Sequence, residues 1–267
     1  MKSLKEMLDL HGRVALITGG AGHIGTALGE ALAELGAAIA VLDLDEAACR
    51  AVTDQLQANF QVPVLPLAID LSREAEVQSV PETVVRQLGR LDILINNAAL
   101  VGTSDLKGWG TPFAEQLPAT WRKALEVNLT APFVLSQACA PALTASTHGT
   151  VINIASIYGV VGPNLSLYEG TRLGNPAAYA ASKGGLIQLT RWLASTLAPA
   201  IRVNALTLGG VWRNQAKQFV DRYTALTPLD RMATEEDFKG AAAYLASDLS
   251  AYVTGHNLIV DGGWTTW

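Results

Sequence analysis

The stretch VALITGGAGHIG, residues 14–25, decides the fold, because it joins a short apolar run to a helix-forming segment through a glycine-rich turn. Glycine lets the chain turn sharply and lets a phosphate group approach the backbone closely. A helix that starts at such a turn presents unpaired N–H groups and the positive end of its dipole to an anion. The stretch therefore predicts a dinucleotide-binding strand–turn–helix unit.

An acidic residue, Asp43, ends the next apolar run and lies 18 residues after Gly25. A carboxylate at this position accepts hydrogen bonds from both hydroxyls of an adenosine ribose and repels a 2′-phosphate. Leu44 follows, where an arginine would favour NADP. We therefore expect NAD as the cofactor. In the alternative interpretation, Asp43 merely ends a strand or caps the helix that begins near Glu46.

Apolar, strand-like runs alternate with helix-length segments along the whole chain. This alternation predicts a parallel sheet with helices on both faces, buried on both sides. We expect an α/β, Rossmann-like, doubly wound fold with a seven-stranded parallel sheet, in a single domain that spans residues 1–267. The expected strands are 14–18, 38–43, 64–69, 93–96, 151–154, 202–206 and 257–260. The expected helices are 24–35, 46–58, 73–88, 121–145, 179–197 and 235–247.

The composition excludes several classes of protein. The chain has 267 residues, 49% of them hydrophobic, a net charge of −5 and no basic stripe, so we expect no nucleic-acid partner. Residues 127–168 contain no charged side chain, but proline and glycine interrupt them. They therefore predict a buried helix and a central strand, with part of the helix available for a subunit interface, and no membrane partner.

The first ten residues and the cysteines indicate the cellular compartment. Residues 1–10 contain four charged side chains and no apolar core typical of a secretion signal, so we expect a cytoplasmic protein. Cys49 and Cys139 lie in alanine-rich, helix-like segments. We expect buried free thiols there and neither a disulfide nor a metal site.

Further motifs follow the expected strands, and in their joint order the sequence resembles the short-chain dehydrogenase/reductase family over nearly its whole length. DL at 70–71 follows the third strand, NNAA at 96–99 the fourth, and VDGGW at 260–264 the last. The resemblance implies an oxidoreductase, usually a homotetramer. With the glycine turn, it implies a cofactor site formed by Gly19, Gly22, His23, Ile24, Gly25, Asp43, Asp70, Leu71, Asn97, Ala98, Tyr179, Lys183, Gly209 and Val211.

Two of these segments depart from the family pattern. His23 stands where the second motif glycine is expected, so it either contacts the cofactor pyrophosphate or is a solvated loop histidine. In LTLGGVWR, residues 206–213, Leu208 replaces a proline and Arg213 lies close to the position of a threonine. Val211 can still offer its backbone to the nicotinamide amide.

The chemical centre is predicted by YAASK, residues 179–183, which places Tyr179 and Lys183 on one face of a helix. A phenol has an ordinary pKa near 10, and a nearby ammonium lowers it. Tyr179 can then take the alcohol proton as hydride leaves the carbon, or return it in reduction.

The resemblance assigns roles to three further residues. It implies that Lys183 also binds the nicotinamide ribose, that Ser156 orients the substrate oxygen, and that Asn128 holds a water for proton relay. Asn128 has an alternative interpretation as a polar residue that is hydrogen-bonded within a buried helix.

The segment between Ser156 and Tyr179 is longer than in most of the family, with 23 residues from one to the other. We expect a substrate loop at about residues 160–178, containing Tyr168 and Arg172. The loop resembles those of sugar and sugar-acid dehydrogenases. It suggests a sugar or polyol as the substrate, with oxidation at the anomeric carbon to a lactone as one option.

Arg172 and Arg213 suggest in addition that the sugar is anionic, because a guanidinium suits a carboxylate, sulfonate or phosphate. Salt bridges, for instance to Glu169 or Asp221, are the alternative for both arginines. Two other functions are alternatives on the same residues. One is a ketoacyl or other small-carbonyl reductase, and the other is a non-catalytic NAD(H)-binding sensor.

Overall fold

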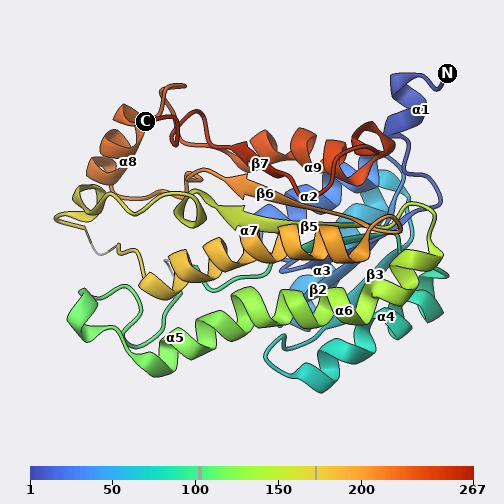
Figure 1. Ribbon diagram of the computed structural model, residues 1–267, viewed down its shortest axis with the longest axis horizontal. Helices are drawn as coiled ribbons and strands as arrows, with labels where there is room; N and C mark the ends of the chain where they lie inside the picture. The colour runs from blue at the N-terminus through green and yellow to red at the C-terminus, as the bar shows by residue number, and fades with distance from the viewer. Residues whose placement is uncertain (102–103, 172) are drawn as a thin grey trace.

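A computed structural model describes residues 1–101, 104–171 and 173–267. Seven strands form one parallel sheet in the order β3-β2-β1-β4-β5-β6-β7 (Figure 1). This confirms the predicted doubly wound, Rossmann-like α/β fold. The strands are β1 (Val14–Thr18), β2 (Ala38–Asp43), β3 (Val64–Ala68), β4 (Ile93–Asn96), β5 (Thr150–Ser156), β6 (Arg202–Leu208) and β7 (Asn257–Val260).

Helices cover both faces of the sheet (Figure 1). One layer holds α2 (His23–Glu34), α3 (Glu46–Phe60) and α9 (Lys239–Ala246), and the other holds α4 (Glu74–Leu88), α6 (Ala131–Ala145) and α7 (Ala177–Leu197). Alternate residues of each strand face opposite layers. In β1, Ile17 packs in the first core and Leu16 in the second. Strand β1 therefore contributes apolar side chains to the cores on both faces of the sheet.

The predicted helix 121–145 is wrong, because the structure divides it into α5 (Pro118–Leu125), a π-helical turn (Glu126–Thr130) and α6. Pro132 lies in the first turn of α6 and has no N–H to donate to the carbonyl of Asn128, four residues earlier. The missing hydrogen bond loosens the helix at this point, which suits a wider turn.

Other element boundaries also differ from the prediction. The predicted helix 235–247 begins as a 3-10 turn, Glu235–Phe238, before α9. Two helices were not predicted, α1 (Leu4–Leu8) and α8 (Lys217–Ala225). Cys49 and Cys139 are buried free thiols, as predicted. Among the described residues, no helix combines the length and the apolar character needed to cross a membrane.

The carboxyl ends of the strands meet at one edge of the sheet. The glycine turn follows β1, Asn97 follows β4, and Ser156 ends β5. The segment between β5 and α7 extends beyond this edge and lies against α8, on the left of Figure 1. Ligands of doubly wound folds bind at this edge, so the fold itself places the candidate site.

Candidate active site

One cleft of about 1370 Å³ runs along the carboxyl edge of the sheet. Its lining includes every predicted site residue that the structure describes except Asn128. Arg172, the remaining predicted substrate residue, lies outside the described residues. The cleft joins the glycine turn to the segment after β5, so one cavity can hold a dinucleotide and a small substrate together.

The glycine turn is held in a tight conformation that only glycine permits. Gly19 has φ of +60°, and a Cβ on Gly25 would lie 2.1 Å from the Gly19 carbonyl oxygen. The Asn97 amide donates hydrogen bonds to the carbonyls of Thr18 and Gly19, both at 3.0 Å. Asn97 and the following Ala98 therefore fix the turn against β4 and form one wall of the cleft.

The start of α2 is suited to a phosphate group. Gly22 is the N-cap and provides no side-chain hydrogen bond to the first turn. The first N–H groups of α2, including those of His23 and Ile24, are therefore available to an anion at the positive end of the helix. The cleft thus fits the pyrophosphate of a dinucleotide, which is the group that the sequence predicts here.

Asp43 ends β2, and its carboxylate lies beside the glycine turn. Its carboxylate accepts hydrogen bonds from the backbone N–H groups of Ala21 at 3.1 Å and Leu44 at 2.8 Å. These contacts fix the carboxylate beside the turn. Asp70 and Leu71 line the neighbouring part of the cleft, where the Ser72 backbone N–H and hydroxyl lower the pKa of Asp70.

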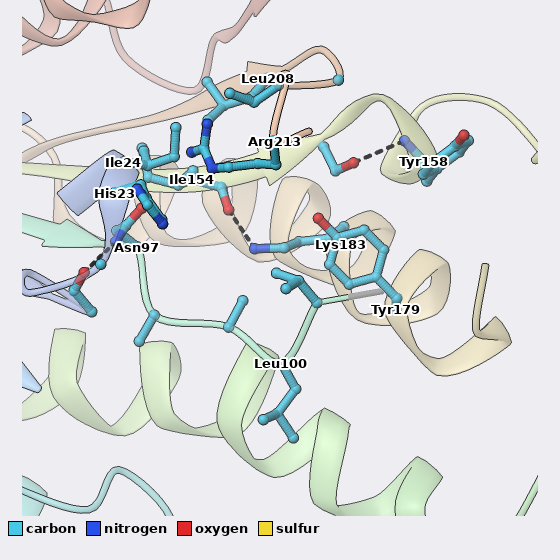
Figure 2. Close-up of a pocket in the computed structure, with 18 of the residues that line it drawn as sticks. His23, Ile24, Asn97, Leu100, Ile154, Tyr158, Tyr179, Lys183, Leu208 and Arg213 are labelled. Atoms are coloured by element: carbon cyan, nitrogen blue, oxygen red, sulfur yellow. Dashed lines mark hydrogen bonds between the residues drawn. The ribbon is translucent and has the colours of Figure 1, made fainter. Parts of the chain in front are cut away.

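Lys183 lies on α7 and reaches back to the sheet (Figure 2). Its ammonium donates a hydrogen bond to the Ile154 carbonyl at 2.7 Å, and its side chain is buried. The Lys183 Nζ is 5.9 Å from the centre of the Tyr179 ring, so the two predicted partners do lie together. Burial lowers the pKa of Lys183 to about 8.

The structure corrects one part of the sequence argument about Tyr179. Burial raises the pKa of this phenol, and the hydrogen bond with the Ser156 hydroxyl lowers it. Ser156 is thus the protein group that lowers the pKa of Tyr179, whereas the sequence predicted Lys183 for this role. The reason is that Lys183 directs its ammonium to the Ile154 carbonyl, toward the sheet.

Ser156 occupies the end of β5, where the strand passes into a 3-10 turn, Ile157–Gly159. Its hydroxyl oxygen accepts a hydrogen bond from the backbone N–H of Tyr158 at 3.2 Å. The strand fixes the backbone of Ser156, and this turn fixes its side chain. The arrangement leaves the hydroxyl beside Tyr179, in the lining of the cleft.

Asn128 is fully buried behind the cleft wall, in the π-helical turn. Its side-chain oxygen accepts from the Leu100 N–H at 2.7 Å, and its amide donates to the Leu100 carbonyl at 3.0 Å and to the Ser182 hydroxyl at 3.1 Å. The side chain thus joins the loop after β4 to α7, which agrees with the structural alternative considered for it.

Arg213 lines the cleft and forms an ion pair with Glu235. The sequence had suggested Glu169 or Asp221 as partners, but Asp221 pairs with Lys217. Glu235 lies 22 residues after Arg213, in the 3-10 turn before α9, so this ion pair depends on tertiary packing that local spacing does not reveal. His23 is largely exposed, with its Nδ1 3.9 Å from the same carboxylate of Glu235.

The segment after Ser156 adds site residues that the sequence analysis missed, above all Tyr158 and Asn175. Both line the cleft together with the predicted Tyr168, and the hydroxyls of Tyr158 and Tyr168 are 2.6 Å apart. The position of Tyr158 two residues after Ser156 was an available signal. Gly209 and Val211 line the same cleft after β6, as predicted, and the Gly210 N–H donates to the Tyr223 hydroxyl.

Comparison with known proteins agrees with this architecture. A family model described as Enoyl-(Acyl carrier protein) reductase matches residues 19–265. The 3-oxoacyl-[acyl-carrier-protein] reductase FabG of Escherichia coli is 31% identical over 96% of this chain and 98% of its own length. Trans-4-hydroxycyclohexanecarboxylate dehydrogenase of Sinomonas cyclohexanicum is 32% identical over 95% of this chain and 93% of its own.

Solved structures extend the same relationship. A gluconate 5-dehydrogenase from Burkholderia cenocepacia, in complex with NADP and tartrate, has a TM-score of 0.88 at 29% identity, covering 99% of this chain and 100% of its own. An NAD+-bound xylitol dehydrogenase has a TM-score of 0.85 at 29% identity, covering 95% of this chain and 99% of its own. The chain belongs to the short-chain dehydrogenase/reductase family and is an oxidoreductase.

Proposed function

We propose that this oxidoreductase is an NAD-dependent dehydrogenase that oxidises a hydroxyl group of a sugar or polyol. The observation that carries the proposal is the arrangement of Ser156, Tyr179 and Lys183 in one cleft with the glycine turn and Asp43. When bound there, the nicotinamide supplies the chemistry of accepting or returning a hydride. The residues of the chain bind, orient and handle the proton.

The proposed proton transfer involves two side chains. Ser156 donates a hydrogen bond to the reacting oxygen and stabilises the charge that develops on it. Tyr179 takes the proton of the alcohol in oxidation or returns it in reduction. Lys183, whose ammonium lies 5.9 Å from the centre of the Tyr179 ring, would bind the nicotinamide ribose. Pro132 has no N–H to donate to the backbone carbonyl of Asn128. We propose that this carbonyl holds the relay water.

The preference for NAD rests on the position of Asp43. Its carboxylate is fixed beside the glycine turn by the N–H groups of Ala21 and Leu44. A 2′-phosphate placed there would meet a negative charge, whereas the two hydroxyls of an unmodified ribose can donate to it. Relatives of this fold bind either cofactor, since one neighbour is NAD+-bound and another is in complex with NADP.

The substrate proposal rests on the polar groups of the segment after Ser156 and on the two sugar and polyol dehydrogenases of similar structure. A ketoacyl reductase is the second candidate function, favoured by the identity with FabG. The anionic-sugar hypothesis loses support at Arg213, whose charge is paired with Glu235. We also propose that the protein is a cytoplasmic homo-oligomer, a tetramer as in most of the family.

A screen of cofactor and substrate tests the proposed function. The purified protein is assayed for NADH production from polyols, neutral sugars, sugar acids and sulfonated sugars, and for NADH or NADPH consumption with acetoacetyl thioesters. We expect turnover of at least one polyol or sugar with NAD, and a kcat/KM for NAD above that for NADP. Turnover restricted to acetoacetyl thioesters with NADPH would replace this function with that of the ketoacyl reductase.

A further inference from the structure

Three polar side chains form a cluster in an otherwise apolar part of the cleft. The hydroxyls of Tyr158 and Tyr168 are 2.6 Å apart, and the amide nitrogen of Asn175 donates to the Tyr168 hydroxyl at 3.5 Å. All three residues line the cleft, and their neighbours in its wall are the apolar Leu173, Phe219 and Met232. We call Tyr158, Tyr168 and Asn175 the tyrosine–asparagine cluster.

The cluster is held in place by α8. Arg222 donates to the carbonyls of Glu169 at 2.7 Å and Ser166 at 3.1 Å, and Gln218 donates to the Gly170 carbonyl at 2.6 Å. The ring of Phe219 packs on that of Tyr168 with centroids 5.5 Å apart. These contacts fix the backbone on both sides of Tyr168, so the cluster is organised without a ligand.

The cluster has one hydrogen-bond donor to spare. The two tyrosine hydroxyls carry two protons, and only one proton can lie in the hydrogen bond between them. Asn175 acts on Tyr168 as a donor, so it does not accept the second proton. Burial raises the pKa of both phenols, so both protons are retained at neutral pH.

The cluster also has one acceptor to spare. The side-chain oxygen of Asn175 is buried and has no hydrogen-bond partner within the described part of the chain. A buried polar atom without a partner destabilises the protein, so such atoms in a cleft point to a ligand. The same small region thus offers one donor and one acceptor.

We propose that the tyrosine–asparagine cluster binds a second hydroxyl group of the substrate, on a carbon other than the one that is oxidised. This inference rests on the proposed function and assigns its specificity to three residues. A hydroxyl both accepts and donates a hydrogen bond, so it satisfies the spare phenol proton and the spare amide oxygen together.

Other substrate groups fit the cluster less well. A carboxylate or a ketone only accepts hydrogen bonds, so it would leave the Asn175 oxygen unsatisfied, and a carboxylate would also be repelled by it. A methylene group would leave both polar atoms unsatisfied. Sites that hydrogen-bond a substrate hydroxyl discriminate strongly against analogues that lack it, for this same reason.

The test compares the best polyol or sugar from the screen with analogues that each lack one hydroxyl, and with cyclohexanol. The variants are Tyr158→Phe, Tyr168→Phe and Asn175→Ala, with Tyr252→Phe as the matched control, because Tyr252 is fully exposed. NADH affinity and the unfolding temperature of each variant report whether the fold and the cofactor site are intact.

We expect one deoxy analogue to lose about 10- to 100-fold in kcat/KM with the wild-type protein. Asn175→Ala and at least one of the tyrosine variants should lose a similar factor on the parent polyol and little on that same analogue. Tyr252→Phe should change neither. This selective loss distinguishes binding of one hydroxyl from a general disturbance of the loop.

Two outcomes would overturn the inference. If Asn175→Ala, or both tyrosine variants, lose the same factor on the parent, on every analogue and on cyclohexanol, or lose nothing, the cluster does not bind a substrate hydroxyl, although the proposed function stands. If the wild-type protein turns over cyclohexanol or acetoacetyl thioesters and no polyol or sugar, the inference and the proposed function are both wrong.

Discussion

The chemical role proposed for Lys183 comes with a structural disadvantage. Its ammonium is buried, and that burial lowers its pKa from 10.5 to about 8. A shift of this size corresponds to roughly 3 kcal/mol of destabilisation below pH 8, where the ammonium form is present in both the folded and the unfolded chain. Between pH 8 and 10.5 the folded protein releases the proton first, so the penalty fades as the pH rises.

Replacing Lys183 should therefore stabilise the protein while removing activity. We expect Lys183→Met to raise the free energy of unfolding at pH 7 by about 1–2 kcal/mol, because the lost hydrogen bond to Ile154 offsets part of the gain. The gain should shrink by pH 10. Urea unfolding at both pH values measures it, with the exposed Lys107→Met as control. A variant less stable than the wild type at pH 7 would refute this expectation.

Asp43 should decide between the two cofactors. Asp43→Asn keeps the size of the side chain but removes the charge, so the 2′-phosphate is no longer repelled. We expect the ratio of kcat/KM for NADP to that for NAD to rise at least about 10-fold. Glu46→Gln, an exposed neighbour on α3, is the control for a general loss of negative charge. An unchanged ratio in Asp43→Asn would show that Asp43 only ends its strand.

Helix α2 contains two glycines with opposite roles. A Cβ on Gly25 would lie 2.1 Å from the Gly19 carbonyl oxygen, whereas a Cβ on Gly29 would meet its nearest atom, in Leu56, at 3.5 Å. Gly25→Ala should abolish NADH binding and lower the unfolding temperature. Gly29→Ala should keep binding and add about 0.5–1 kcal/mol of stability. Fluorescence titration with NADH and thermal unfolding measure both effects, and equal behaviour would contradict this geometry.

The strands were predictable because each is a short apolar run, and five of the six expected helices were found with only small shifts of their ends. The π-helical turn was not predictable, because proline is common in the first turn of an ordinary helix. Only the structure shows that the hydrogen bond that Pro132 cannot donate would have gone to the carbonyl of Asn128, inside the predicted helix. Helix α8 was missed because its sequence contains few apolar residues. Its burial depends on Phe219 and Tyr223 packing on a distant segment.

The candidate site shows the same division. The residues of the glycine turn, Ser156 and the Tyr179–Lys183 pair were predictable, because local spacing determines their positions. The partner of Arg213 and the tyrosine–asparagine cluster were not, because they depend on contacts between segments far apart in the chain or within an irregular loop. Sequence motifs thus predict the reaction, whereas the residues proposed to bind the substrate come together only through tertiary contacts.

Two neighbouring helices of the molecule, α6 and α7, each carry an exposed aromatic side chain. Phe133 on α6 is 39% exposed and Trp192 on α7 is 55% exposed, and the two helices lie side by side (Figure 1). Large apolar side chains exposed on adjacent helices are typical of an interaction surface. This observation supports the proposed homo-oligomer.

We expect sedimentation velocity to show an assembly larger than a monomer at micromolar concentration. Trp192→Glu should shift it to a smaller species, because a charge would be buried at the interface. Tyr252→Glu, on an exposed residue of another segment, is the control. A monomeric wild-type protein, or a Trp192→Glu variant that assembles normally, would contradict the proposed interface.

The most direct test of the proposed function is the Tyr179→Phe variant, measured both for NADH binding and for turnover of the best polyol or sugar. The change removes only the hydroxyl, so the ring keeps its packing on α7 and its place beside Lys183. We predict that NADH affinity stays within about 2-fold of the wild type while kcat falls at least about 100-fold. Retained turnover would show that Tyr179 is not the acid–base group.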